Sequence, residues 1–366
     1  MIIGVPKEVK THEYRVGLTP TSVRELVSHS HQVIVEKGAG AGIGVLDSVY
    51  EKAGARIGDP WEAELVVKVK EPQREERARL QERHVLFTYL HLAPDPEQAR
   101  DLLRSGAICI AYETVTSARG GLPLLAPMSE VAGRMAVQVG ASSLEKERGG
   151  MGILLGGVPG VPPAKVTVLG AGVAGTNAIR IAVGTGARVY ALDRSLEALR
   201  GIEREFGARV VTVHSSRDTV ESHVLSADLV IGSVLVPGAA APKLVSRQMV
   251  KDMKQGAVVV DIAIDQGGCF ETSRPTTHAD PTYIVDGVVH YCVANMPGAV
   301  PRTSTYALNN ATLPFVIALA NKGWKRALAE DPHLGGGLNV ARGRVTHREV
   351  AAALKTSYSP AEELLR

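Results

Sequence analysis

A glycine-rich segment, VTVLGAGVAG, carries the most specific chemical pattern in this 366-residue sequence. Gly170, Gly172 and Gly175 follow an apolar run and open a helical pattern. In such a G-x-G-x-x-G turn the first glycine permits a tight turn, the second lets the backbone approach a pyrophosphate, and the third lets helix and strand pack closely. Val173 and Ala174 lie at the start of the helix, where free N–H groups would face the phosphates. The segment therefore predicts a dinucleotide site.

Asp193 lies 18 residues after Gly175, at the end of the next apolar run. A carboxylate in this place can accept hydrogen bonds from ribose hydroxyls and repels a 2′-phosphate, so the spacing favours NAD over NADP. The neighbouring Arg194 weakens that preference, and a turn or helix-start role for Asp193 is the alternative.

Four ionisable side chains elsewhere could bind an anion or move a proton. Arg15 lies in the segment EYRVGLTP, Lys70 in KVKEP and His91 in YLHLA. Cationic side chains suit a carboxylate substrate, and histidine is the side chain best matched to proton transfer near neutral pH. Asp265, in AIDQGG, follows an apolar run and is expected at the mouth of the nucleotide site. Each has an ordinary alternative: a solvated Arg, an edge-strand Lys, a core His or a turn-forming Asp.

The second half of the chain has the strand pattern that the glycine-rich turn requires. Short, almost continuously apolar runs alternate there with helical or loop segments. They occupy residues 165–170, 187–193, 208–213, 227–234, 256–263 and 288–293. Such runs are typical of a doubly wound parallel sheet covered on both faces, and a ligand then binds beyond the carboxyl ends of its strands. We therefore expect a Rossmann domain here.

The first part of the chain also alternates β-branched runs with helical patterns, which indicates an α/β domain with parallel strands. Small and apolar residues at helical spacing then predict a connecting helix from Met128 to a stop at Gly149 and Gly150. After Pro301 the pattern is again helical, with a kink or restart expected at Pro314. The remaining residues are expected to return and pack on the first domain.

The predicted architecture is therefore α/β with two domains, in which a Rossmann doubly wound parallel sheet is inserted into a second α/β substrate domain with its own parallel sheet. The expected parts are residues 1–127 for the first part of the substrate domain, 128–303 for the NAD-binding domain with its connecting helix, and 304–366 for the return helices.

Composition narrows the class of protein. A chain of 366 residues can bury two cores, and 45% hydrophobic with 22% charged residues is the balance of a globular protein. The 41 Lys and Arg nearly cancel 38 Asp and Glu, which gives no sign of a nucleic-acid partner. Three widely spaced cysteines indicate neither a disulfide framework nor a zinc site, so no metal is expected. The N-terminal segment lacks the layout of a secretory signal, and no run reaches the roughly 18 apolar residues of a membrane helix, so a cytoplasmic protein without a membrane partner is expected.

Over essentially its whole length the sequence resembles bacterial alanine dehydrogenase. The segments that carry the resemblance are, in order, IGVPKE, E-x-R-V-x-x-T-P, KVKEP, FTYLHLA, PLLAPMSEVAGR, GGVPGV, VLGAGVAG, LVPGAxAPKLV, VDIAIDQGGCFE, SRPTTH and CVANMPGAVPRTSTYAL. The resemblance implies two α/β domains, the second inserted in the first, and NAD-dependent oxidative deamination of L-alanine to pyruvate and ammonium.

The same resemblance implies roles for individual residues. Arg15 and Lys70 would hold the substrate carboxylate and carbonyl, His91 would be an acid/base, and Asp265 would be the second catalytic group. Further residues would surround the substrate or the nicotinamide and adenosine portions of the cofactor: Met128, Ser129, Ser215, Leu235, Asn295 and Met296. Members of the family are typically hexamers, so a homo-oligomer is expected.

The nucleotide-binding part of proton-translocating transhydrogenase is the main alternative, because it is similar around the E-x-R-V and glycine-rich segments. It passes hydride to a second nucleotide and has no amino-acid site. The transhydrogenase pattern lacks a histidine at the position of His91 and has a longer insertion after the third Rossmann strand, whereas only 13 residues separate Val213 from Ala227 here. Both features favour the dehydrogenase. A bare NAD-sensing module would leave the charges of the first domain unexplained.

Overall fold

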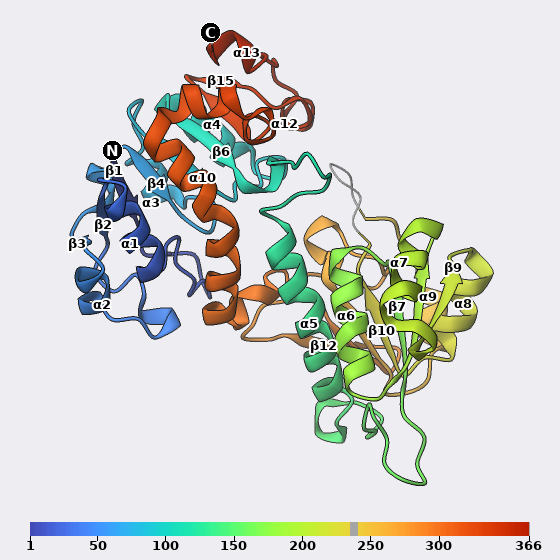
Figure 1. Ribbon diagram of the computed structural model, residues 1–366. Helices are drawn as coiled ribbons and strands as arrows, with labels where there is room; N and C mark the ends of the chain where they lie inside the picture. Colours follow the sequence, from blue (N-terminus) through green and yellow to red (C-terminus); the bar gives the residue numbers. More distant parts are fainter. Residues whose placement is uncertain (235–240, 366) are drawn as a thin grey trace. The chain divides into compact units, whose positions relative to one another are not determined.

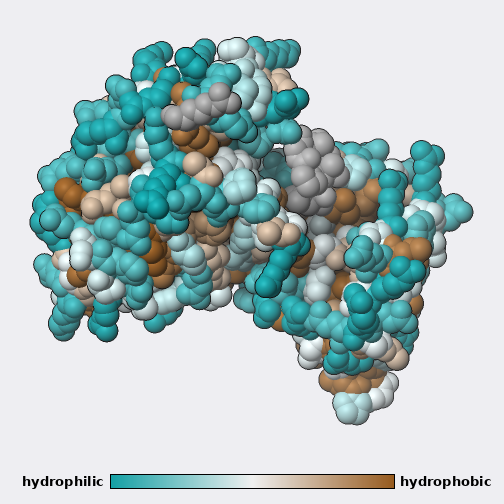
Figure 2. Space-filling model, turned by 45° about the horizontal axis from the view of Figure 1, so that its top comes forward, coloured by the Kyte–Doolittle hydropathy of each residue, from teal (hydrophilic) through white to brown (hydrophobic). Residues whose placement is uncertain are grey.

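The computed structural model describes residues 1–234 and 241–365. By its internal contacts the chain divides into two compact units, each an α/β structure (Figure 1). Unit 1 comprises Met1–Met128 and Val300–Arg366, and unit 2 comprises Ser129–Ala299. In the described part of the chain no helix is both long and apolar enough to cross a membrane. Hydrophilic side chains cover much of each unit on the face drawn in Figure 2.

Unit 1 is built on an eight-stranded sheet with the order β15-β14-β6-β5-β4-β1-β2-β3. The strands are β1 (Ile2–Val5), β2 (Gln32–Val35), β3 (Arg56–Ile57), β4 (Leu65–Val67), β5 (Val85–Thr88), β6 (Ile108–Ala111), β14 (Leu338–Ala341) and β15 (Arg344–Val345). Strands β1 to β6 pair in parallel, as the alternating pattern predicts. β14 adds antiparallel to β6, and β15 adds antiparallel to β14.

Helices of unit 1 that pack against strands of this sheet are α1 on β2, α2 on β3, α4 on β14, α10 on β4 and α12 on β15. The helices of unit 1 are α1 (Pro20–Ser28), α2 (Asp47–Lys52), α3 (Arg74–Arg77), α4 (Pro96–Ser105), α10 (Pro301–Glu330), α11 (Pro332–Gly335), α12 (Arg348–Leu354) and α13 (Glu362–Leu365). Two expectations need correction. The C-terminal return, expected as helices alone, also supplies β14 and β15, and the non-helical dihedral angles in α10 occur at Gly323 (φ 71°, ψ 157°) and not at Pro314.

Unit 2 is built on a seven-stranded sheet with the order β12-β13-β11-β10-β7-β8-β9. The strands are β7 (Lys165–Leu169), β8 (Arg188–Asp193), β9 (Val210–His214), β10 (Leu229–Gly232), β11 (Val258–Asp261), β12 (Thr282–Val285) and β13 (Val288–Tyr291). Apart from the antiparallel edge strand β12, all pair in parallel. The strands of the predicted series lie in the Rossmann order 3-2-1-4-5-6, which confirms the predicted fold class.

The helices of unit 2 are α5 (Ala126–Ser143), whose first residues belong to unit 1, α6 (Val173–Gly184), α7 (Leu196–Phe206), α8 (Arg217–Leu225) and α9 (Arg247–Asp252). α6 packs on β7, β8 and β10, and α7 packs on β8 and β9. Fully buried apolar side chains, such as Val230, Val259 and Phe270, form the core on one face of the sheet. The core fixes the carboxyl ends of β7, β8 and β9 side by side, which is where the glycine-rich turn lies (Figure 1).

Candidate active site

Each glycine of the turn after β7 meets a different steric demand. Gly170 has φ +100°, a backbone conformation that side-chain-bearing residues rarely adopt. A Cβ atom on Gly175 would lie 1.8 Å from the carbonyl oxygen of Gly170, so only glycine permits this approach of α6 to the strand. A Cβ on Gly172 would have no neighbour within 4 Å. Gly172 caps α6 without any side-chain hydrogen bond, so the backbone donors of Val173 and Ala174 face open space.

This helix start fits a dinucleotide. The N-terminus of an α-helix offers N–H groups and a partial positive charge, and the lack of a Cβ at Gly172 leaves room for the pyrophosphate. Beside it lies a cavity of about 190 Å³, whose wall includes Gly170, Asp193, Arg194 and Ser215. A larger cavity of about 340 Å³ lies at the opposite end of the strands, where Ala164 precedes β7, and its lining is mostly apolar. The smaller cavity is the candidate nucleotide site because the donors of the glycine-rich turn lie there.

Asp193 ends β8 and contributes to the turn as well as to the cavity. One carboxylate oxygen accepts a hydrogen bond from Ala171 N at 2.7 Å, and the other accepts from Ser195 N at 2.7 Å. The carboxylate therefore fixes the path of the glycine-rich turn directly. Each oxygen retains a second lone pair, so these bonds leave the proposed ribose contact chemically open. Ser215 N bonds the carbonyl oxygen of Asp193, which holds the end of β9 next to it.

The other predicted residues of unit 2 follow strands β11 and β13. Asp265 lies exposed in the 3-10 turn η6 (Ile262–Gln266). Asn295 is half-buried, and its carbonyl oxygen lies 2.8 Å from His278 Nε2. Met296 is buried at the start of η7 (Met296–Ala299). Ser129 is half-buried in the first turn of α5, and Leu235 lies outside the described residues.

Asp261, which the sequence analysis did not single out, shapes the segment after β11. It is fully buried, and its Oδ2 accepts from Cys269 N at 2.8 Å and from Ser273 Oγ at 2.6 Å. A Cβ on Gly268 would lie 2.5 Å from that same Oδ2, so the double glycine lets the chain close on the carboxylate. Burial raises the pKa of Asp261 above its ordinary value. The carboxyl group thus fixes the loop that carries Asp265.

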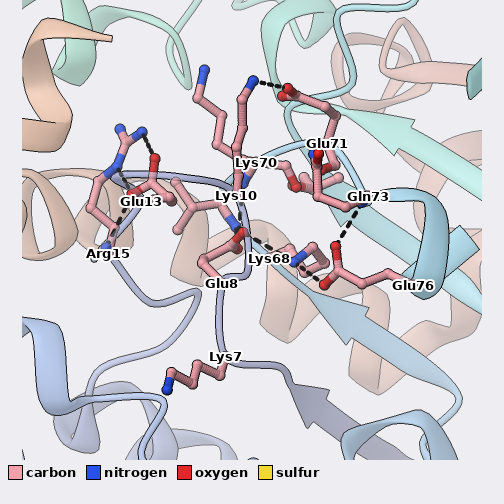
Figure 3. Close-up of polar contacts among 12 residues, drawn as sticks. Lys7, Glu8, Lys10, Glu13, Arg15, Lys68, Lys70, Glu71, Gln73 and Glu76 are labelled. Atoms are coloured by element: carbon pink, nitrogen blue, oxygen red, sulfur yellow. Dashed lines mark hydrogen bonds and ion pairs between the residues drawn. The ribbon is translucent and has the colours of Figure 1, made fainter. Parts of the chain in front are cut away.

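In unit 1, Arg15 is held by Glu13 in a buried, bidentate pair (Figure 3). Arg15 Nε donates to one carboxylate oxygen at 2.7 Å and Nη2 to the other at 2.6 Å, while Nη1 points at Met128 Sδ, 2.9 Å away. Burial acts to lower the pKa of Arg15, but the hydrogen bonds and charge of Glu13 outweigh it and the pKa lies above its ordinary value. The guanidinium therefore stays charged in a buried place, where a second anion would be strongly attracted.

The backbone around Arg15 is tied to helix α10. Val16 N donates to Thr305 Oγ1 at 3.3 Å. Asn309, which is 2% exposed, accepts from Thr19 N at 2.9 Å and donates from Nδ2 to Gly17 O at 2.8 Å. These bonds explain why the C-terminal segment must return to the first domain: it supplies the side chains that hold the arginine segment.

Lys70 follows β4 and lies close enough to Arg15 for the two charges to interact. Burial, with Arg15 and Lys10, lowers the pKa of Lys70, although Glu71 opposes the shift. Within the described residues its Nζ makes no hydrogen bond, whereas Lys10 pairs with Glu71 (Figure 3). Two neighbouring cations, one of them without a hydrogen-bond partner, are suited to receive a carboxylate.

A buried ion network that the sequence analysis missed supports Lys70. Lys68 is completely buried, and its Nζ donates to Glu8 at 3.0 Å and to Glu76 at 2.6 Å. The other oxygen of Glu8 accepts from Val69 N at 2.7 Å and from Lys70 N at 3.4 Å. Burial acts against the charge of Lys68, but the two carboxylates raise its pKa above the ordinary value. The network fixes the backbone from which Lys70 extends (Figure 3).

His91 lies beyond the end of β5 and has a half-exposed side chain. Its ring stacks on Tyr89 with centroids 5.7 Å apart. Burial acts to raise the pKa of Glu71, but Lys70, Lys10 and, to a smaller extent, His91 lower it below its ordinary value, so His91, Lys70 and Glu71 share one neighbourhood. Unit 1 thus brings together the predicted Arg15, Lys70, Met128 and His91. Unit 2 separately gathers the glycine-rich turn, Asp193 and Ser215.

Cys109, Cys269 and Cys292 are free and buried. Burial raises the pKa of both Cys109 and Cys269 to about 12, so neither forms a thiolate near neutral pH. Among the described residues no cluster of three or more His, Cys, Asp or Glu side chains could hold a metal ion.

Family models cover nearly the whole chain. "Alanine dehydrogenase/PNT, N-terminal domain" matches residues 4–132, and "Alanine dehydrogenase/PNT, C-terminal domain" matches residues 136–348. The chain belongs to the alanine dehydrogenase/PNT family. It is 61% identical to an alanine dehydrogenase of Halomonas elongata over the full length of both chains. It is 55% identical to an alanine dehydrogenase of Bacillus subtilis, over 100% of this chain and 98% of that one.

Two solved structures of the family are similar to this fold. An L-alanine dehydrogenase matches with a TM-score of 0.94 at 53% identity, over 97% of this chain and 99% of the other. A transhydrogenase from Sinorhizobium meliloti matches with a TM-score of 0.83 at 27% identity, over 94% of this chain and 100% of the other. Identity therefore separates the two branches of the family, and this chain lies on the alanine dehydrogenase side.

Proposed function

We propose that the protein is an L-alanine dehydrogenase, which oxidatively deaminates L-alanine to pyruvate and ammonium, reversibly, with NAD. The observation that carries the proposal is the pair of cations formed by buried Arg15 and half-buried Lys70, with His91 close by, in a chain 61% identical to an alanine dehydrogenase over its full length. An amino acid presents a carboxylate that this pair can bind. The transhydrogenase pattern lacks a histidine at the position of His91.

The substrate side of the proposal assigns one task to each group of unit 1. Arg15 and Lys70 bind the carboxylate and the oxygen that becomes the keto group, and Met128 supplies an apolar wall beside Arg15. His91 moves a proton during hydrolysis of the imine to the keto acid, because imidazole can both donate and accept a proton near neutral pH. Asp265 is the second catalytic group, and Asn295 contributes to substrate and cofactor binding.

The cofactor side rests on the open helix start at Gly172. We propose that the turn from Gly170 to Gly175 holds the pyrophosphate of NAD and that Asp193 and Ser215 bind the adenosine side. Ser129, Leu235 and Met296 complete the cofactor contacts. NAD, when bound, accepts the hydride from the α-carbon of the substrate.

We further propose that residues 1–127 and 304–366 serve the substrate and residues 128–303 serve the cofactor, and that the protein works in the cytoplasm as a homohexamer. Assembly is supported by the loop before β7, where Leu154, Val158 and Val161 are 67%, 56% and 59% exposed. Clustered exposed apolar side chains commonly mark protein interfaces. Light scattering on the purified protein tests this, and a monomeric mass contradicts it.

One assay tests the activity. Purified protein is mixed with NAD and a panel of amino acids, and NADH formation is followed by absorbance. The proposal expects NADH with L-alanine and no requirement for a membrane partner. If no amino acid yields NADH, and the chain instead speeds hydride exchange between nucleotides when mixed with a transhydrogenase partner, the transhydrogenase alternative is correct.

A further inference from the structure

The turn that carries His91 has an unfavourable backbone conformation. His91 has φ +47°, in the left-handed region that residues other than glycine seldom adopt. Such a conformation persists only where the surroundings fix it, and it is common at functional sites. The fixing group is Glu113, in the 3-10 turn η3 (Tyr112–Thr114) after β6. Its carboxylate accepts from His91 N at 2.6 Å, and both oxygens accept from Leu90 N at 3.2 Å.

The same carboxylate also faces the imidazole ring. Glu113 Oε1 lies 4.0 Å from His91 Nδ1, and the Glu113 side chain is 16% exposed against 37% for His91. A carboxylate beside one ring nitrogen favours a proton on that nitrogen and leaves the other nitrogen for the substrate. The geometry therefore favours the Nδ1–H tautomer of His91, with Nε2 available to exchange a proton.

We infer that Glu113 is the positioning residue of His91: it fixes the turn, orients the imidazole through Nδ1 and stabilises the imidazolium form. This inference rests on the proposed function, in which His91 transfers a proton to or from the substrate. A single carboxylate that accepts hydrogen bonds from the peptide and lies 4.0 Å from Nδ1 of the ring couples the strained turn to the acid/base chemistry of the side chain.

The other charges around His91 are accounted for. Glu71 also interacts with His91, but its charge is shared with Lys70 and Lys10. Tyr89 packs on the ring and is neutral, since burial raises the pKa of its hydroxyl. Behind Glu113 lies His347, whose pKa is lowered by burial, so it is largely uncharged near neutral pH. Among the described residues Glu113 forms no ion pair except that with His91. Glu113 also interacts with Tyr89 and His347, but the His91 ring is its ion-pair partner within the described residues.

The test replaces only the charge. Glu113→Gln keeps the shape and one oxygen that can accept the two peptide hydrogen bonds, but loses the anion. In protein labelled with ¹⁵N-histidine, with the signal assigned by its loss in His91→Gln, the pKa of His91 should be lower in Glu113→Gln than in the unmodified protein, because a nearby opposite charge favours the charged form. The limb of the kcat/KM profile for alanine that follows His91 should move to lower pH by the same amount. NAD affinity should not change.

Gln98→Met is the matched control. Gln98 Nε2 donates to Leu90 O at 2.6 Å, so this variant removes an uncharged contact to the same turn. It should lower kcat without moving the pKa of His91. Glu113→Asp, which keeps the charge, should hold the pKa of His91 closer to that of the unmodified protein than Glu113→Gln does.

Three results would overturn the inference. One is an unchanged His91 pKa in Glu113→Gln, which would leave Glu113 with a backbone role alone. Another is an equal pKa change in Gln98→Met. The third needs no variant: ¹⁵N shifts of the unmodified protein that place the neutral proton on Nε2. Because the titration does not depend on turnover, a lack of alanine-dependent NADH would contradict the proposed function while leaving the coupling of Glu113 and His91 separately measured.

Discussion

The two candidate binding regions of this protein differ in the groups that they offer to a ligand. The turn at Gly170 to Gly175 in unit 2 presents backbone donors and works by the absence of side chains. The cluster around Arg15 and Lys70 in unit 1 consists of charged side chains in a largely buried setting, where Glu13 fixes Arg15 and where Glu8 and Glu76 fix Lys68, two positions before Lys70. A helix start needs no partner to hold its N–H groups in place. A buried guanidinium does, because an unpaired buried charge is costly.

This difference explains where each region keeps its supporting residues. The nucleotide turn is supported locally, by Asp193 on the neighbouring strand and by contact between Gly175 and Gly170. The charged cluster is supported by residues distant in sequence: Asn309 on α10 lies about 290 positions from the segment it holds. We therefore expect substitutions in unit 1 to act on catalysis and those in the turn to act on cofactor affinity.

The largest effect should come from the proton-transfer groups. His91→Ala and Asp265→Asn should each lower kcat by about 10²–10⁴-fold, the usual contribution of a positioned acid or base, while NAD affinity remains. Fluorescence titration of NAD and steady-state kinetics measure the two quantities. The double variant should lose less than the product of the single losses, because groups that act as a unit fail together.

If His91→Ala keeps most of its kcat, the expectation that substitutions in unit 1 act on catalysis is contradicted. His91 would then be a structural histidine, and Asp265 or Lys70 would have to carry the proton.

The next effect concerns the carboxylate anchor, the pair of Arg15 and Lys70 proposed to bind the substrate carboxylate. Lys70→Ala should reduce kcat/KM for alanine and for pyruvate, because it removes one partner of the charged contact with the substrate carboxylate. The loss of transition-state stabilisation should be about 2–5 kcal/mol. NAD affinity should remain nearly unchanged. A loss confined to NAD binding would show that Lys70 belongs to the cofactor side and would contradict the division of tasks between the two regions.

The lowered pKa of Lys70 gives this anchor a pH dependence. Below that pKa the ammonium is charged and binds the carboxylate, and as pH rises through it the charge and the affinity are lost. Pyruvate binding in the absence of ammonium is the appropriate measurement, since pyruvate has no group that titrates in the alkaline range. Lys70→Arg keeps its charge and should move the loss to higher pH. The same alkaline midpoint in both proteins would assign the titration to another group.

The central strands of unit 2, β7, β10, β11 and β13, could be predicted because they are buried on both faces and so read as continuous apolar runs. Edge strand β12 was missed, although Asp286 and Gly287 form a two-residue hairpin turn with φ +48° and +82°. Asp-Gly between two apolar runs is a strong hairpin signal, so this miss was avoidable. β14 pairs with β6, a segment far away in sequence, so no local pattern predicts that pairing. β15 pairs with β14 itself, across a two-residue turn at Arg342 and Gly343 with φ +52° and +75°.

The site divides in the same way. The glycine-rich turn could be predicted because its three glycines meet local steric demands within six consecutive residues. Glu13 had a local signal, two positions before Arg15, but Glu8 supports Lys70 across 62 positions and Glu113 supports His91 across 22. No spacing rule links such pairs, since the sheet order alone brings them together. The positive φ of His91 likewise follows from tertiary contacts and not from its own sequence.

The turn itself offers a sharper comparison of two glycines. Gly172→Ala introduces a methyl group into open space, so the free energy of unfolding should change by less than about 0.5 kcal/mol. The methyl group would, however, obstruct the pyrophosphate, and NAD affinity should fall by about 1–3 kcal/mol. Gly175→Ala places a methyl group against Gly170 O and should destabilise unit 2 by about 1–3 kcal/mol or more. Thermal unfolding and NAD titration separate the two, and a stable Gly172→Ala protein with normal NAD affinity would remove the turn from the cofactor site.

The smallest effect should be on the choice of cofactor. Asp193 repels a 2′-phosphate by its charge, but its oxygens also hold Ala171 N and Ser195 N. Asp193→Ala removes both functions, so it should weaken binding of NAD and NADP alike while narrowing the preference for NAD by about 1–3 kcal/mol. Asp193→Asn keeps an oxygen for one backbone donor and removes the charge.

The asparagine variant should therefore show the narrower preference with a smaller loss of affinity for NAD itself. The measurement is kcat/KM for NAD and NADP at saturating alanine in the unmodified protein and both variants. If Asp193 had a backbone role alone, its replacement would weaken the binding of NAD and NADP equally and leave the ratio of their kcat/KM values unchanged. Equal rates with NADP in the unmodified protein would contradict the ribose assignment outright, and Arg194, on the same cavity wall, would then be the residue to replace.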